Sequence, residues 1–145
     1  KGRIHIAAIC VGVADRMLRD ALRYASDRKQ FGHAIAEFQL VQAMLADSKA
    51  ELYAARCMTL DAAQRRDRGE NVSTEASCAK LFASEMCGRV ADRAVQVFGG
   101  AGYMAEYGIE RFYRDVRLFR IFEGTSQIQQ LLIARNMMKG DSRGG

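Results

Sequence analysis

The chain has 145 residues, of which 49% are hydrophobic and 27% charged, and its formal net charge is +5. This length suits one compact domain, and this composition excludes both a disordered chain and a chain of long apolar membrane spans. The basic residues are interspersed with 17 acids, and the densest basic run, RRDR at residues 65–68, suits the solvated end of a helix. We therefore predict no nucleic-acid partner and no membrane association.

The first two predicted helices follow from small or apolar residues that recur at steps of three and four, the period of one helix face. In the first helix these residues are Ile4, Ala7, Val11, Ala14, Leu18, Ala21 and Ala25. Gly32 stands where a helix C-terminal glycine is expected. In the second helix, which would reach about Arg66 and span about 45 Å, they are Phe38, Val41, Leu45, Ser48, Leu52, Ala55, Thr59 and Ala62.

A third helix is predicted after the polar loop RDRGEN, with Ser73 or Thr74 as its N-terminal cap and Glu75 in its first turn. Many alanines stand on its expected inner face and predict close packing. The face comprises Ala76, Ala79, Ala83, Met86, Val90, Ala94 and Val97.

Two shorter elements complete the chain, one from about Glu106 to Asp115 and one from about Ser126 to Met138. Ser126 and Gln129 have the spacing of a capping box. No stretch predicts a strand, and the absence of proline permits long helices throughout. The predicted fold is all-α: an antiparallel bundle of three long helices plus two shorter C-terminal helices, forming one domain over residues 1–139 and followed by a disordered tail at 140–145.

The cysteines and histidines do not predict a metal site. The four cysteines show no CxxC spacing, and neither histidine is arranged with them as a ligand. Buried reduced thiols in a reducing compartment are the expected state, although four cysteines could also pair. These residues are Cys10, Cys57, Cys78, Cys87, His5 and His33.

Three short stretches carry more chemistry than a helical bundle requires. In YASDRKQFG, residues 24–32, two cations and a glutamine follow an aromatic residue; alone this suits a helix C-terminus. In QVFGGAGYMAEYG, residues 96–108, three glycines follow the third helix, where one would end it. Two interpretations of this segment are therefore equally supported: an ordinary turn, or a backbone that closely approaches a phosphate or a dinucleotide.

The third stretch is RLFRIFEGTSQIQQ, in which Glu123 precedes the last helix. An acid in this place can simply complement the positive end of the helix. Alternatively, Ile121 and Phe122 would partly desolvate the carboxylate and make it a stronger base, while unpaired amides at the helix start would polarise a carbonyl. From the residues alone, both interpretations stay open.

Taken together, RKQFG, QVFGGAGY and FEGTSQIQ resemble the C-terminal all-helical domain of the acyl-CoA dehydrogenases, from Lys1 to about Met138. The resemblance implies an FAD enzyme that oxidises an acyl-CoA thioester to the trans-2-enoyl-CoA. Glu123 matches the base that removes the α-proton, and its backbone amide matches a donor to the thioester carbonyl. Some branches of the family place the base beside Arg3 instead, but that position is Gly2 here, which favours Glu123.

The resemblance also assigns further site residues. Arg3 and Gly124 match substrate contacts. The residues that match FAD contacts are Arg28, Lys29, Gln30, Phe38, Gln39, Gln96, Val97, Phe98, Gly99, Gly100, Thr125, Ser126 and Gln127. The segment from Arg28 to Gln30 matches one that reaches the FAD of a neighbouring subunit. The usual tyrosine before the base is Phe122, which leaves the preferred acyl length open.

Several expectations about the whole protein follow from the same resemblance. The family's N-terminal helical and middle β domains are absent from this chain, so we expect it to be part of a longer enzyme and inactive alone. It should self-associate as a dimer of dimers and pass electrons to an electron-transferring flavoprotein, in the bacterial cytoplasm or, in a eukaryote, the mitochondrial matrix. The alternatives are a flavin oxidase or monooxygenase of the same fold, or a non-enzymatic helical self-association module.

Overall fold

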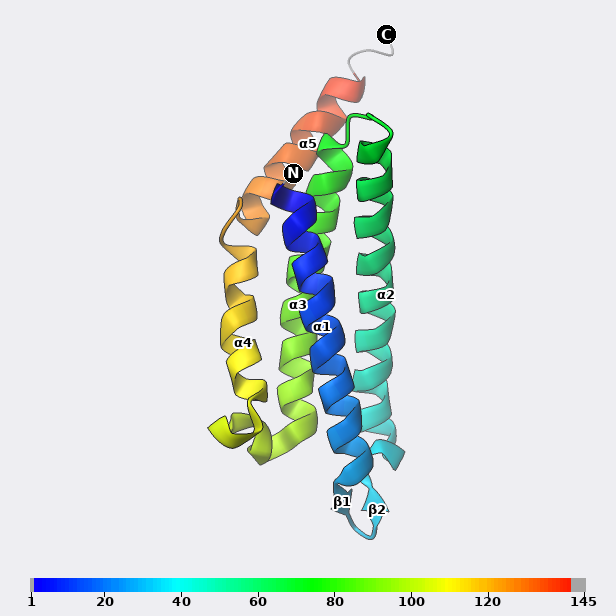
Figure 1. Cartoon of the computed structure of the whole chain (residues 1–145), viewed down its shortest axis with the longest axis vertical. Helices are drawn as coiled ribbons and strands as arrows, with labels where there is room; N and C mark the ends of the chain where they lie inside the picture. Colours follow the sequence, from blue (N-terminus) through cyan, green and yellow to red (C-terminus); the bar gives the residue numbers. More distant parts are fainter. Residues whose placement is uncertain (1, 142–145) are drawn as a thin grey trace.

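The structure is a computed structural model that describes residues 2–141, and it is built almost wholly of helices (Figure 1). There are three long helices, α1 (Gly2–Asp27), α2 (Gln39–Asp67) and α3 (Ser73–Phe98), and α2 runs antiparallel to both α1 and α3. Two shorter helices follow, α4 (Ile109–Arg117) and α5 (Ser126–Asp141). Single 3₁₀ turns occupy Ile35–Glu37, Gly99–Tyr103, Ala105–Tyr107 and Leu118–Arg120. The predicted all-α architecture is confirmed.

Helix α3 is the central element, because it packs against α1, α2, α4 and α5. All seven residues predicted for its inner face are buried. Ala79 and Ala83 on α3 and Ala7 and Ala14 on α1 are completely inaccessible to solvent. Such small side chains let neighbouring helix axes approach closely, as the alanine pattern predicted.

The structure corrects the end of the first helix. Helix α1 ends at Asp27, and residues Lys29–Gln30 (β1) pair antiparallel with His33–Ala34 (β2) in a small hairpin. Phe31 and Gly32 form its turn with φ angles of +52° and +81°. Two-residue hairpin turns of this kind need positive φ at both positions, so Gly32 serves the hairpin and does not cap α1. The prediction that the chain has no strand was therefore wrong.

The predicted helix caps were also wrong. Ser73 and Thr74 do not cap α3; their hydroxyl oxygens accept hydrogen bonds of 3.2 Å from the amide of Asn136 on α5. At α5 the cap is Thr125, whose Oγ1 accepts the Ile128 N–H at 3.2 Å, so Ser126 forms no capping box. The hydroxyl groups that were predicted to cap helices instead form hydrogen bonds between α3 and α5.

Two boundaries near the C-terminus differ from the prediction. Helix α4 begins at Ile109, directly after Gly108, which has a left-handed φ of +71°. Helix α5 continues to Asp141, and residues 142–145 of the predicted tail lie outside the described residues. Helices α2 and α3 are also joined by charged side chains. Glu51 of α2 accepts hydrogen bonds from Arg89 at 2.8 Å and Arg93 at 2.9 Å, both on α3. No helix among the described residues is long and apolar enough to cross a membrane.

Candidate active site at the start of helix α5

Glu123 lies in the loop between α4 and α5, on the side of the bundle where α1 begins (Figure 1). Its backbone is left-handed, with φ of +54°, and Gly124 follows with φ of +86°. A residue with a side chain adopts this conformation at a cost of about 1–3 kcal/mol, and such residues concentrate at functional sites. The surrounding structure must therefore hold Glu123 in place.

Lys80 of α3 supplies one part of that support. Its side chain is completely buried, and its Nζ donates hydrogen bonds to the carbonyl oxygens of Phe119 at 2.8 Å and Gly124 at 2.7 Å. Burial lowers the pKa of Lys80, while the charges of Cys10, Glu85 and Glu123 oppose that shift. One ammonium thus binds the loop on both sides of Glu123.

Gln129 of α5 supplies a second part. Its side chain is 1% exposed, and its Nε2 donates to the carbonyl oxygens of Glu123 at 3.3 Å and Gly124 at 3.1 Å. A Cβ added to Gly124 would lie 2.5 Å from this Nε2, so the close approach of the amide requires glycine there. The positive φ of Gly124 favours glycine for the same position.

A third support joins α3 to both ends of the loop. Glu85 accepts the hydroxyl hydrogen of Ser126 at 2.6 Å and a hydrogen bond from Arg120 at 3.3 Å. The Arg120 guanidinium lies against Gly88, where a Cβ would meet its Cζ at 3.3 Å. Helix α3 therefore positions the loop through two separate charged side chains, Lys80 and Glu85.

The Glu123 carboxylate lies over Gly2 at the start of α1. A Cβ added to Gly2 would collide with Oε2 and would lie 3.2 Å from Cδ, so only glycine leaves room for the carboxylate here. The carboxylate is exposed, contrary to the expected desolvation by its neighbours. Ile121 is 49% exposed, and the ring of Phe122 stacks on Phe119 instead of covering Glu123.

Hydrogen-bond donors accompany the carboxylate. The N–H groups of Glu123 and Gly124 have no backbone carbonyl partner within residues 2–141, and the first N–H groups of α5 have none within their helix. Arg3 follows Gly2, but its guanidinium points to α3 and donates to Ser73 O at 3.0 Å and to Ser77 Oγ. The structure thus brings the predicted base Glu123, amide donors and the predicted substrate residue Gly124 together, with Arg3 turned to one side.

The predicted FAD residues form two groups. Thr125, Ser126 and Gln127 lie beside Glu123, and the rest lie at the opposite end of the bundle, around the hairpin and the end of α3 (Figure 1). Helix α1, with 26 residues, separates the groups by about 39 Å. Ser126 is buried and bonded to Glu85, whereas Gln127 is exposed.

The distal group has features that suit a dinucleotide. Residues 28–30 are exposed and carry two cations, and such cations bind phosphate oxygens well. Gly99 and Gly100 are exposed, with open space where a side chain would stand, so a ligand can reach their backbone. Val97 and Phe98 are 5% and 8% exposed, so their side chains belong to the core.

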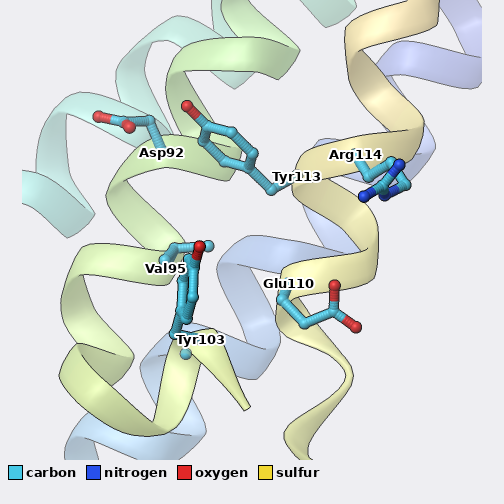
Figure 2. A pocket seen from close by; sticks show the side chains of 7 residues that line it. Asp92, Val95, Tyr103, Glu110, Tyr113 and Arg114 are labelled. Carbon is cyan, nitrogen blue, oxygen red and sulfur yellow. The ribbon is translucent and has the colours of Figure 1, made fainter. Parts of the chain in front are cut away.

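A hollow of about 530 Å³ lies between α3 and α4, beside the Gly99–Tyr103 turn and away from Glu123. It is lined by Asp92 and Val95 of α3 and by Glu110 and Tyr113 of α4, and Figure 2 shows the Tyr113 ring reaching from α4 toward α3. Charges of both signs line it, and none of the residues predicted to bind substrate or FAD does so. The hollow is therefore separate from the Glu123 site.

Lys80, Glu85 and Gln129 were not predicted from the sequence to belong to the site. A signal was present for Lys80, because it follows Ala79 and stands four residues after Ala76, on the alanine face of α3. A lysine in that register is unusual, since lysine is almost never fully buried.

The sequence profile described as "Acyl-CoA dehydrogenase, C-terminal domain" matches residues 1–138. The chain is 51% identical over 138 residues to the Probable acyl-CoA dehydrogenase YngJ of Bacillus subtilis, covering 95% of this chain and 36% of that protein. It is 46% identical to the Caffeyl-CoA reductase-Etf complex subunit CarC of Acetobacterium woodii, with the same coverage. The chain thus spans about a third of the length of these relatives.

Solved structures agree. Butyryl-CoA dehydrogenase from Megasphaera elsdenii superposes with a TM-score of 0.93 at 38% identity, covering 94% of this chain and 36% of that one. The FAD complex of PigA superposes with a TM-score of 0.88 at 37% identity, covering 90% and 34%. The PigA complex supports FAD as the cofactor predicted from the sequence. The chain belongs to the acyl-CoA dehydrogenase family and corresponds to the C-terminal domain of that family.

Proposed function

We propose that this chain is the catalytic C-terminal domain of an FAD-dependent enzyme that oxidises an acyl-CoA thioester to the trans-2-enoyl-CoA. The observation that carries the proposal is Glu123, an exposed carboxylate on a left-handed backbone whose own N–H lacks a backbone partner among residues 2–141. Strain of this kind is kept where a function needs the geometry.

In the proposed reaction the Glu123 carboxylate takes the α-proton, and the electron pair of that C–H bond moves toward the thioester carbonyl. The Glu123 N–H donates to the carbonyl oxygen and stabilises the charge that develops there. Removal of one such donor costs about 3–4 kcal/mol in enzymes that use comparable devices. When bound, FAD accepts the β-hydrogen as hydride.

The two groups of FAD residues lead to a proposal about assembly. Thr125 to Gln127 would contact the flavin that serves Glu123 of the same chain. The distal group, around the hairpin and Gly99–Gly100, would contact the FAD of another copy, since α1 separates it from Glu123 by about 39 Å. This division supports self-association, proposed as a dimer of dimers.

The electron acceptor proposed for the whole enzyme is an electron-transferring flavoprotein. The name of the CarC relative, a subunit of a reductase-Etf complex, supports such a partner. The same name favours a second candidate function, reduction of the double bond of an unsaturated acyl-CoA. Glu123 would then return a proton to the α-carbon, so both directions use the same base.

The test is Glu123→Gln in the complete FAD-loaded enzyme, a change that keeps the shape and removes the base. Anaerobic addition of acyl-CoA should bleach the flavin of the unmodified enzyme, and bleaching should be abolished in the variant. Glu106→Gln is the matched control, because Glu106 is an exposed acid in the Ala105–Tyr107 turn. Undiminished bleaching by Glu123→Gln would refute the assignment. Oxidation of the pre-reduced enzyme by an enoyl-CoA, with no bleaching by any acyl-CoA, would favour the reductase.

A further inference from the structure

Lys80 combines burial and charge in a way that the packing of the bundle does not explain. It is the largest completely buried side chain among the described residues, and it stands among alanines on the inner face of α3. An alkyl side chain would fill the same space without bringing a charge into the core. Burying an ammonium is unfavourable unless its hydrogen bonds compensate.

Those hydrogen bonds serve a single segment. Nζ binds Phe119 O, in the 3₁₀ turn after α4, and Gly124 O, just before α5, and both acceptors belong to the segment between α4 and α5 that carries Glu123. The two carbonyl groups are five residues apart in the chain. Fixing both to one atom leaves the four residues between them little freedom to change their backbone angles.

The two carbonyl groups differ in what remains when Lys80 is removed. Gly124 O keeps the hydrogen bond from Gln129, whereas Phe119 O loses its ammonium donor. The loop could then relax at Glu123, where the left-handed backbone is strained. Relaxation there would turn the Glu123 N–H and move its carboxylate away from Gly2.

We propose that Lys80 is a positioning residue for the base: it anchors the loop on both sides of Glu123 and so sets the direction of its N–H and its carboxylate. The inference rests on the proposed function, since it assigns Lys80 a role in the reaction of Glu123. It also makes a claim about loop geometry that needs no catalytic turnover to test.

The experiment compares Lys80→Met with the unmodified complete enzyme. Hydrogen–deuterium exchange of residues 119–129 should accelerate about 10-fold, while residues 6–25 of α1 and 41–66 of α2 stay protected. The rate of anaerobic flavin reduction should fall about 100-fold, as expected for a displacement of about 1 Å. The substrate for this measurement is the acyl-CoA that bleaches the unmodified enzyme fastest in a panel of chain lengths, and its Kd should be unchanged.

Two further variants separate positioning from general stability. Lys80→Gln keeps N–H donors without the charge. It should therefore restore at least part of the slow exchange of residues 119–129 and part of the rate of flavin reduction. Lys49→Met removes an exposed lysine from α2 and should change neither measurement. If Lys80→Met does not fold, hydrogen exchange and flavin reduction are measured on Lys80→Gln instead. Smaller effects are then expected in the same segment.

Several results would overturn the inference. Exchange that rises equally in all helices would make Lys80 a structural residue only. Unchanged exchange in residues 119–129 would show that Lys80 does not anchor the loop. Faster exchange in the loop with an unchanged rate of flavin reduction would mean that its position does not matter for the chemistry. Bleaching by Glu123→Gln would instead refute the proposed function, and the exchange result would still report the role of Lys80 in the loop.

Discussion

Gly2→Ala tests the geometry of the site most directly, because a single methyl group enters the space of the carboxylate. The added carbon would collide with Oε2 of Glu123 and lie 3.2 Å from Cδ. Carbon atoms in favourable contact are about 3.5–4.0 Å apart. The carboxylate, as the end of a flexible side chain, must therefore move by about 1 Å, while the helix itself can stay in place.

The expected effects on stability and activity have opposite signs. Alanine is favoured over glycine in a helix by up to about 1 kcal/mol, so Gly2→Ala should leave the free energy of unfolding unchanged or raise it. A displacement of about 1 Å at the proposed base should lower the rate of flavin reduction about 100-fold. That loss corresponds to about 2.7 kcal/mol in activation free energy.

The assay pairs urea unfolding with anaerobic flavin reduction by acyl-CoA in the complete enzyme. Gly12→Ala is the matched control, because Gly12 lies on the same helix, is exposed and has nothing within 4 Å of an added Cβ. It should gain up to about 1 kcal/mol of helix stability without loss of rate. If Gly2→Ala reduces the flavin as fast as Gly12→Ala does, the carboxylate does not react from its place over Gly2.

Two other predictions concern stability and thiol chemistry. Burial would raise the pKa of Glu51, but hydrogen bonds and charges from its two arginines on α3 hold that pKa below its usual value of 4.5. This stabilisation is present above pH 4.5 and is lost as the pH falls through the folded-state pKa of Glu51. Glu51→Gln should therefore lower the free energy of unfolding by about 1 kcal/mol at neutral pH and by less near pH 3. A loss of stability that is independent of pH would contradict the ion pairs. Among the thiols, the hydrogen bond with Cys10 and burial raise the pKa of Cys87, whereas Cys57 is exposed. An aromatic disulfide reagent at pH 8 should therefore label Cys57 first and reach Cys87 only on unfolding, and rapid native labelling of Cys87 would show that the core opens.

The helices could be predicted from the sequence because their pattern is long and regular. The inner face of α3 has seven residues at steps of three and four, and every residue assigned to it is buried. The hairpin could not be predicted in the same way, since each strand has only two residues and period-two alternation cannot be recognised over so short a length. Phe31 also occupies a turn position with positive φ, where glycine or asparagine is the usual residue, so its identity does not indicate a turn.

The site was only partly predictable. The resemblance predicts Glu123 and Gly124 as site residues, but the left-handed backbone of Glu123 has no signature in a residue with an ordinary side chain. Lys80 was missed because pattern reasoning counts lysine as a surface residue. Ser126 was assigned as a cap because its local sequence suits one, whereas its hydroxyl bonds Glu85, 41 residues away in the chain. Contacts between distant segments decided each of these positions.

The position of the carboxylate over the first turn of α1 has a practical consequence for handling this domain. A purification tag or fluorescent reporter fused ahead of Gly2 would emerge beside Glu123 and would compete with any ligand for the space around it. The C-terminal end of α5 lies farther along the bundle, beyond the start of α1 (Figure 1). Fusions and surface immobilisation should therefore use the C-terminus, so that the carboxylate stays open to solvent.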